Sequence, residues 1–350
     1  MKLFLHIGSQ KTGSTSIQKF LLLNKSILQS QGFYVPDYLG GSNHRHAVFL
    51  AEDINKREDG FVVSQGLQGN IEKKRSFKEN LLNRMRSDCS NNNHKCWIIS
   101  SEFFQSCLCT YEELRTLRSI LHSLFSEISI ICYIRDPLST ALSTWSTYIM
   151  SGGVANKLHK PNTIYHNNCD HESLVRRWSD VFNNEQIDIR HFSRKRLICN
   201  DVARDFCSAI GIYVNEDFKM PNESNKSLSY KGILTLSYIN IKIKNMNIDR
   251  KSRHDLGQLI QSTFKDYPRY TPTKEEVISY HNAYKDSYRW VSNNYFGYYE
   301  SIMLVHLDKA NTRNNNDYKC ELSKAEKAYI DLIVNLWIKN CSRKELNIKF

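Results

Sequence analysis

The feature that most constrains this chain is a glycine-bounded turn near its N-terminus, between a short apolar strand and a helix. Residues 3–7 have the composition of a buried strand, residues 8–13 form the turn, and residues 14–31 have the apolar periodicity of a helix. The helix positions expected to face inward are Ile17, Phe20, Leu21, Ile27 and Leu28. Backbone N–H groups in such a turn and at a helix N-terminus point toward an anion, and the helix dipole strengthens the attraction. The layout therefore predicts a phosphate-binding loop.

The loop departs from the nucleotide-triphosphatase pattern at one position. Gly8 and Gly13 have the same four-residue gap as in G-x-x-x-x-G-K-[ST], and Thr15 occupies the Ser/Thr position. Ser14 stands at the lysine position, and the lysine comes three residues earlier, as Lys11. A kinase or ATPase needs that lysine on the β- and γ-phosphates and a metal-binding carboxylate on a later strand. The relocated lysine therefore indicates a shorter donor without a γ-phosphate.

Strand and helix patterns alternate along the first part of the chain. Further strands are expected at residues 32–36, 96–100, 128–134 and 187–192, and a helical stretch separates each from the next. This alternation predicts a three-layer α/β fold in which helices cover both faces of a central parallel sheet. Beyond residue 220, helical and aromatic segments such as 230–243 and 275–295 dominate. We therefore expect a single domain over residues 1–350, with an α/β core at 1–220 and a helical C-terminal part at 221–350 packed on it.

A second candidate phosphate contact follows the strand at 128–134. Arg135 stands at its carboxyl end, where a guanidinium can bind a phosphate through two hydrogen bonds. Asp136 can cap the helix that follows, and Pro137 suits its first turn. The apolar stripe of this helix consists of Leu138, Ala141, Leu142, Trp145 and Ile149. Ser143 lies two turns into the helix, off the stripe, where its hydroxyl could reach the same phosphate. Taken alone, the sequence Arg135-Asp136-Pro137 would also be typical of an ordinary strand end followed by a capped helix.

Residues 6–18 resemble the 5′-phosphosulfate loop of carbohydrate-type sulfotransferases, whose core is K-[TAG]-G-[ST]-[ST]. Residues 133–143 are similar to the 3′-phosphate motif of that family, R-D-P with a serine eight residues after the arginine. Segments 99–102, 189–194 and 225–229 look like lesser landmarks of bacterial members. The resemblance implies a P-loop NTPase-like sulfotransferase fold and sulfuryl transfer from 3′-phosphoadenylyl sulfate (PAPS) without a metal. The donor site that it implies consists of Lys11, Thr12, Gly13, Ser14, Thr15, Ser16, Arg135 and Ser143, with Lys11 stabilising the leaving group.

The resemblance also implies a Glu or His after the second strand as the base that takes the proton of the acceptor hydroxyl. Here the segment 43–50 contains His44 and His46, which resemble the His-x-His arrangement of some uronyl sulfotransferases. A histidine suits the role because its pKa lies near working pH. In a strand the two side chains would share a face, whereas in a helix they would diverge and leave only one at the site. A surface pair of histidines is the alternative, and Glu102, at the end of the third strand, is the reserve candidate; it could instead orient Lys11 or bind acceptor hydroxyls.

The net charge of +12 favours an anionic partner, such as a nucleotide, an acidic glycan, a membrane surface or nucleic acid. The basic clusters at 176–177 and 194–196 could hold an acidic glycan or form solvated faces. A P-loop kinase is the alternative enzyme, and a basic nucleic-acid-binding protein is the alternative outside catalysis. Aromatic and basic residues interleave at 284–290, but no recognised nucleic-acid module is present, so we expect no nucleic-acid partner.

Cysteine spacing and hydropathy indicate the compartment. None of the ten cysteines forms a C-x-x-C pair, so we expect reduced thiols that hold no metal. The apolar runs are too short to cross a bilayer and the N-terminus lacks a signal-peptide pattern, which predicts a cytoplasmic protein. The expected acceptor is a carbohydrate or glycolipid, such as the precursor of a bacterial surface polysaccharide. The sequence leaves open the oligomeric state and a peripheral contact with a membrane surface.

Overall fold

The computed structural model describes residues 1–91, 94–163, 166–183, 187–221, 227–246, 248–312 and 321–347. The chain divides into two compact units made of interleaved segments. The first, which we call the sheet unit, comprises Met1–Asp136, Asp170–Ser224 and Asp286–Tyr299. The second, the helical unit, comprises Pro137–Cys169, Asn225–Lys285 and Glu300–Phe350. Of the landmark predicted at 225–229, Asn225 and Lys226 lie outside the described residues.

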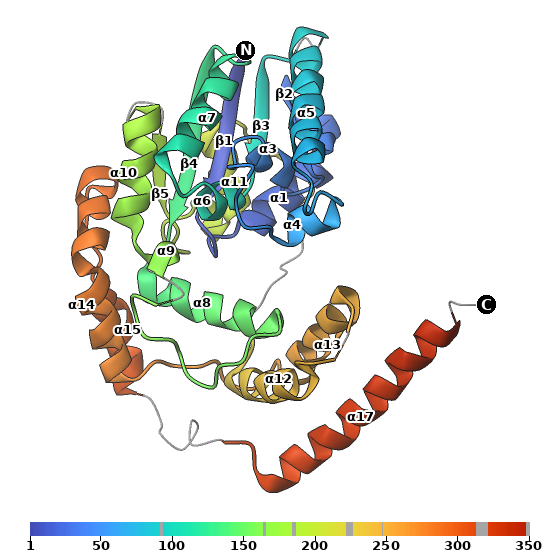
Figure 1. Cartoon of the computed structure of the whole chain (residues 1–350). Helices are drawn as coiled ribbons and strands as arrows, with labels where there is room; N and C mark the ends of the chain where they lie inside the picture. Colours follow the sequence, from blue (N-terminus) through green and yellow to red (C-terminus); the bar gives the residue numbers. More distant parts are fainter. Residues whose placement is uncertain are drawn as a thin grey trace. The chain divides into compact units, whose positions relative to one another are not determined.

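The sheet unit is built on one parallel sheet of five strands (Figure 1). The strands are β1 (Lys2–Gly8), β2 (Phe33–Tyr34), β3 (Cys96–Ser100), β4 (Glu127–Ile134) and β5 (Ile187–His191). Their order across the sheet is β2-β3-β1-β4-β5, so β1 lies between β3 and β4. The parallel sheet predicted from the sequence is therefore confirmed. Since all strands are parallel, the segments that follow β1, β3, β4 and β5 start from the same edge of the sheet.

Helices connect these strands and cover both faces of the sheet. The helices of the sheet unit are α1 (Ser14–Leu23), α2 (Lys25–Ser30), α3 (Arg45–Phe49), α4 (Gly60–Ser64), α5 (Ile71–Asn91), α6 (Phe103–Cys107), α7 (Tyr111–His122), α10 (His171–Phe182) and α11 (Val202–Ala209). Two 3₁₀ turns, η1 (Asp37–Leu39) and η3 (Ile198–Asn200), and a π-helical turn, η4 (Ser292–Phe296), complete the unit.

One face of the sheet packs against α1 and α11. Phe4 and Ile131 lie in a single buried cluster with Ile17 of α1 and Phe206 of α11. The other face carries Trp97, which is fully buried and contacts the ring of Phe125 edge-on at 5.4 Å. The buried leucines of α7 cover this second face, where α7 packs against β4 (Figure 1). The result is the three-layer α/β arrangement that the alternating strand and helix patterns predicted.

The helix predicted at residues 14–31 is interrupted at Asn24, which separates α1 from α2. The Asn24 side chain is buried, and its amide N–H groups donate to the carbonyls of Phe20 at 2.8 Å and Lys219 at 2.9 Å. Its side-chain oxygen accepts from the backbone N–H of Lys219 at 2.7 Å. An asparagine that satisfies the end of one helix from its own side chain competes with continuation of that helix. The prediction of one continuous helix was therefore wrong at this residue.

The helical unit contains α8 (Pro137–Met150), α9 (His166–Cys169), α12 (Tyr230–Ile243), α13 (Arg250–Thr263), α15 (Ile302–Asn311) and α17 (Lys324–Asn347). The sequence predicted the helices after Arg135 and at 230–243, and both are confirmed. Helix α14 (Lys274–Val291) lies within the predicted 275–295 helix and continues into η4; its residues from Asp286 onward belong to the sheet unit.

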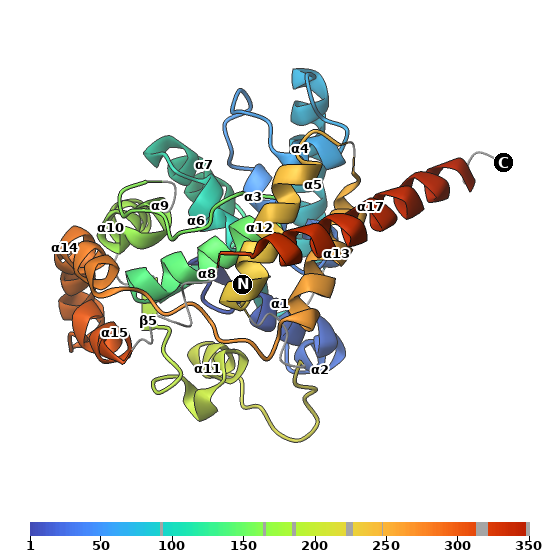
Figure 2. The same cartoon turned by 90° about the horizontal axis from the view of Figure 1, so that it is seen from below.

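Buried polar contacts bind α8 to α12 within the helical unit. Asn240 donates to the carbonyls of Ile149 and Gly153, both at 2.8 Å. Helix α17 crosses α12 (Figure 2), and Lys231 of α12 pairs with Glu326 of α17. Among the described residues, no helix combines the length and the apolar character needed to span a membrane.

Replacing Asn24 with alanine tests its structural role. Asn24→Ala removes the buried amide that binds both the carbonyl and the N–H of Lys219, which should lower the free energy of unfolding by about 2 kcal/mol. Urea denaturation followed by circular dichroism measures this loss. Ser30→Ala, which removes an exposed hydroxyl from α2, is the control and should change stability by less than about 0.5 kcal/mol. Equal stability of the two variants would contradict the role given to Asn24.

Candidate functional site

The loop between β1 and α1 is shaped by hydrogen bonds to the end of β4. The backbone N–H and the hydroxyl of Ser9 both donate to the carbonyl of Tyr133, at 3.0 and 2.9 Å. The Thr12 hydroxyl donates to the carbonyl of Ser9 at 2.6 Å. Lys11, with φ of 66°, and Gly13, with φ of 81°, adopt left-handed conformations that turn the chain before α1 begins. The hydroxyl of Thr12 is thus used inside the loop.

The concave side of the loop presents backbone donors. Within the described part of the chain, the N–H groups of Thr12, Gly13, Ser14 and Thr15 have no acceptor, whereas those of Ser16 and Ile17 donate to the carbonyl of Gly13. The Ser14 hydroxyl is buried and has no hydrogen-bond partner among the described residues. Four N–H groups and a buried hydroxyl without acceptors at the N-terminus of a ten-residue helix suit an anion. The residues present therefore fit the phosphosulfate group that the sequence predicted here.

Both loop glycines stand where a side chain would collide with neighbours. A Cβ on Gly13 would lie 2.9 Å from Cγ1 of Val202 and 3.2 Å from the ring of Phe192. A Cβ on Gly8, which has φ of 103°, would lie 3.2 Å from Cα of Glu102. The close approach of these backbones explains in physical terms why the loop begins and ends with glycine.

Arg135 meets the loop. Its Nη1 donates to the carbonyl of Lys11 at 3.2 Å, and its guanidinium lies 5.7 Å from the centre of the Phe192 ring. The Arg135 carbonyl accepts from Nε2 of the buried His171 at 2.6 Å, which fixes the backbone at the end of β4. Burial lowers the pKa of Lys11, the charge of Arg135 lowers it further, and the charge of Glu102 opposes both. The two sequence motifs therefore meet in one cationic site.

Glu102 also belongs to this site. It stands two residues after the end of β3, the strand next to β1, and its Oε2 accepts from Nε2 of Gln18 at 2.7 Å. Gln18 lies on α1, four residues after Ser14. Among the described residues, no hydrogen bond occupies the other carboxylate oxygen, Oε1. A carboxylate held by one oxygen, within electrostatic range of Lys11, can accept a proton or a hydrogen bond from a bound hydroxyl.

The segment with the two histidines is helical, so the two side chains diverge. His44 precedes α3 in a left-handed conformation and is buried. Its Nδ1 accepts from the backbone N–H of Ser100 at 3.0 Å, which requires the proton of the neutral ring to sit on Nε2. Burial lowers the pKa of His44 to about 4. In this tautomer Nε2 is a donor, so His44 cannot take a proton there while the bond to Ser100 persists.

His46 has the opposite tautomer. Its Nδ1 lies 2.9 Å from the carbonyl of Tyr38, which only a protonated Nδ1 can contact as a donor, so Nε2 keeps its lone pair. The ring is half-buried and packs at 5.4 Å against both Phe61 and Phe77. Burial lowers the pKa of His46, and the charge of Arg45 lowers it further. The hydrogen bond to the carbonyl of Tyr38 raises the pKa and offsets part of this shift. His46 could accept a proton, but it packs among phenylalanines rather than on the loop.

Three predicted donor residues remain. Thr15 is exposed and Ser16 half-buried, both in the first turn of α1. Ser143 is half-buried on α8, which belongs to the helical unit. Their contacts with a donor stay predictions.

Sequence reasoning missed three residues of the site. Gln18 holds Glu102, the Gln105 side chain accepts from the backbone N–H of Gln10 at 3.4 Å, and Phe192 supports both Gly13 and Arg135. Gln18 could have been found, because it is the polar residue one turn after Ser14 on the helix that begins at the loop. Gln105 comes from a distant segment and carried no local signal, whereas Phe192 lies in the landmark 189–194, which gave it no role.

Comparison with known proteins gives one weak similarity. No family model matches the chain, and no curated protein matches it by sequence. The chain is similar to a crystal structure of a sulfotransferase from Alicyclobacillus acidocaldarius, with 14% sequence identity and a TM-score of 0.39. The alignment covers 71% of this chain and 97% of the sulfotransferase chain.

The buried His44 predicts a pH dependence of stability. Burial lowers its pKa from 6.5 to about 4. Between pH 6.5 and 4, His44 is therefore protonated in the unfolded chain and neutral in the folded chain. This contribution is therefore fully present above pH 6.5 and is lost as the pH falls toward 4, with a slope of about 1.4 kcal/mol per pH unit.

His44→Asn tests this contribution, because asparagine tolerates the left-handed backbone and offers an oxygen near the position of Nδ1. Urea unfolding between pH 4 and 6.5 should show a shallower loss of stability in this variant than in the wild type. His254→Asn, at an exposed position, is the control. An unchanged slope in His44→Asn would mean that the buried ring titrates as it does in water.

Proposed function

We propose that this protein is a sulfotransferase that moves a sulfuryl group from PAPS to a hydroxyl of a carbohydrate or glycolipid acceptor. The observation that carries the proposal is the hydrogen bond from Arg135 to the carbonyl of Lys11 at 3.2 Å, which joins the two donor motifs. PAPS carries anionic groups at both its 5′ and 3′ positions, so it needs cations and donors from more than one segment. The loop and Arg135 supply them.

The reaction assigns a task to each part of the site. The acceptor oxygen attacks sulfur in line with the bond between sulfur and the bridging oxygen of the 5′-phosphate. As the new S–O bond forms, the old one breaks, its electron pair leaves with 3′-phosphoadenosine 5′-phosphate, and a base takes the hydroxyl proton. Lys11 would neutralise charge on the bridging oxygen, and the N–H groups at 12–15 would stabilise the sulfuryl and phosphate oxygens.

Among the candidate bases, Glu102 has the best support. Its backbone lies close to Gly8 of the loop, and its charge raises the pKa of Lys11. Only Oε2 of its carboxylate is bonded to Gln18, which leaves Oε1 for a bound hydroxyl. The bond from Ser100 leaves His44 as a donor, and His46 packs against Phe61 and Phe77. We therefore assign the base role to Glu102 and a structural role to His44.

The alternative functions have less support. A P-loop kinase would need a lysine at position 14, where this chain has a buried serine hydroxyl. The positive charge that suggested nucleic-acid binding is in part used by the loop, Arg135 and internal ion pairs such as Arg45 with Glu52. The acceptor class and a cytoplasmic, bacterial setting rest on the sequence resemblance.

Ligand-induced stabilisation tests the donor assignment. Without added metal, 3′-phosphoadenosine 5′-phosphate should raise the melting temperature of the wild type more than ATP with Mg²⁺ does, because a ligand that binds the folded state stabilises it. Lys11→Ala and Arg135→Ala should each lose this shift and reduce transfer of labelled sulfate by at least about 100-fold. Lys73→Ala, an exposed lysine on α5, should keep both. Selective stabilisation by ATP with Mg²⁺ would favour the kinase instead.

A second comparison identifies the base. Glu102→Gln should reduce kcat by about 100-fold or more while the shift with 3′-phosphoadenosine 5′-phosphate persists, because the amide keeps its size but accepts no proton. His46→Asn and His44→Asn should keep kcat within about tenfold of the wild type. Loss of kcat in His46→Asn, with Glu102→Gln active, would transfer the base role to His46.

A further inference from the structure

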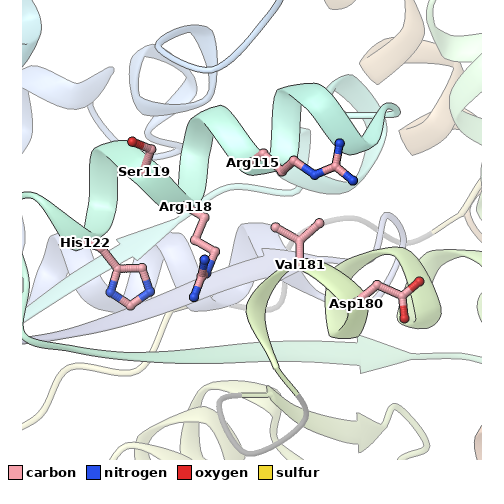
Figure 3. A pocket seen from close by; sticks show the side chains of 6 residues that line it. All are labelled: Arg115, Arg118, Ser119, His122, Asp180 and Val181. Carbon is pink, nitrogen blue, oxygen red and sulfur yellow. The ribbon is translucent and has the colours of Figure 1, made fainter.

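A groove of about 510 Å³ lies between α7 and α10, on the sheet unit and apart from the residues of the loop. It is lined by Arg115, Arg118, Ser119 and His122 of α7 and by Asp180 and Val181 at the end of α10 (Figure 3). We call it the α7–α10 groove. Its volume lies within the range of pockets that hold small organic ligands of a few rings.

The basic side chains follow from the pattern of α7. This helix buries Leu114, Leu117 and Leu121 toward the sheet. An adjacent, exposed face carries Arg115, Arg118, Ser119 and His122, and their spacings of three, four and seven residues from Arg115 place them together along the helix. At 1.5 Å per residue, this face extends over about 10 Å.

The arginines of the groove are not neutralised by the protein. Within the part of the chain that the structure describes, Arg115 and Arg118 make no hydrogen bond or ion pair, in contrast to Arg45, Arg176 and Arg190, which all pair with carboxylates. The one acidic side chain that lines the groove, Asp180, already accepts a hydrogen bond from the Tyr111 hydroxyl at 2.8 Å.

A third arginine adds to the charge. Arg177 lies close enough for its charge to act on the Tyr111 hydroxyl, as does that of Arg115. Its Nε is buried without a hydrogen-bond partner among the described residues. The groove thus presents the guanidinium groups of Arg115 and Arg118, which can bind carboxylates and sulfates through paired N–H donors, and Arg177 lies near the Tyr111 ring beside it.

We propose that the α7–α10 groove binds a segment of an anionic glycan, with Arg115 and Arg118 on its carboxylate or sulfate groups. A single small anion would engage only one end of a basic face about 10 Å long, whereas a linear chain with repeated acidic groups engages it throughout. A nucleic-acid duplex is too wide to enter a cavity of this size. The choice of a glycan rests on the proposed function; the requirement for anionic groups rests on the groove alone.

Calorimetry with a uronic-acid-containing hexasaccharide tests the proposal. The wild type should bind it at low salt, more weakly at 0.5 M salt, and should not bind a neutral hexasaccharide. The double variant Arg115→Ala with Arg118→Ala should weaken binding at least tenfold. The double variant Arg115→Lys with Arg118→Lys, which keeps the charge but not the paired donors, should give an intermediate affinity. Replacing Arg75 and Arg86, exposed arginines of α5, with alanine should have no effect.

Lys11→Ala separates the groove from the donor site, because it should abolish the shift with 3′-phosphoadenosine 5′-phosphate and leave glycan binding intact. Glycan binding that survives while the nucleotide never stabilises the protein would overturn the proposed function and leave the groove standing. Wild-type affinity in the double alanine variant would overturn the proposal that the groove binds the glycan. So would loss of glycan binding in Lys11→Ala, equal binding of the neutral hexasaccharide, or tighter groove-dependent binding of a short DNA duplex.

Discussion

The carbonyl of Tyr133 accepts two hydrogen bonds from Ser9, and through them the end of β4 sets the shape of the loop that follows β1. Two residues further, Arg135 donates to the carbonyl of Lys11 from the same strand end. One strand terminus therefore both shapes the loop after β1 and places a second cation, Arg135, beside Lys11. The parallel order β3-β1-β4 makes this arrangement possible, because the carboxyl ends of neighbouring parallel strands lie at one edge of the sheet. Glu102 arrives at that edge from β3 in the same way.

The sequence predicted the elements better than it predicted the contacts between them. Strand positions, the parallel sheet and the loop followed from local periodicity and glycine spacing, which act over a few residues. The break at Asn24 did not follow, because its cause is a hydrogen-bonding partner at Lys219, far along the chain. Phe192 lay in a segment that the sequence singled out, but its position beside Arg135 depends on the fold. For the two histidines, the pattern was visible, but their tautomers depend on Ser100 and Tyr38, which only the fold brings near.

The structure uses its positive charge in two different ways. Arg45 and Arg190 are enclosed by carboxylates, where their role is to hold segments together. Lys11 and Arg135 face the loop, and Arg115 and Arg118 face the α7–α10 groove, where no carboxylate pairs with either groove arginine in the described part of the chain. A net charge of +12 is therefore no uniform property of the surface. The cations of the loop and of the α7–α10 groove are gathered at two places instead of being spread evenly.

Lys11 stands at φ of 66°, a backbone conformation that suits glycine far better than a long side chain. At this position conformational preference and charge select different residues. Glycine would relax the turn and remove the only side-chain cation of the loop, so a chain chosen for stability alone would drift away from lysine here. Lys11 is also partly desolvated and lies beside Arg135, so a conformational cost and an electrostatic cost fall on the same residue of the loop.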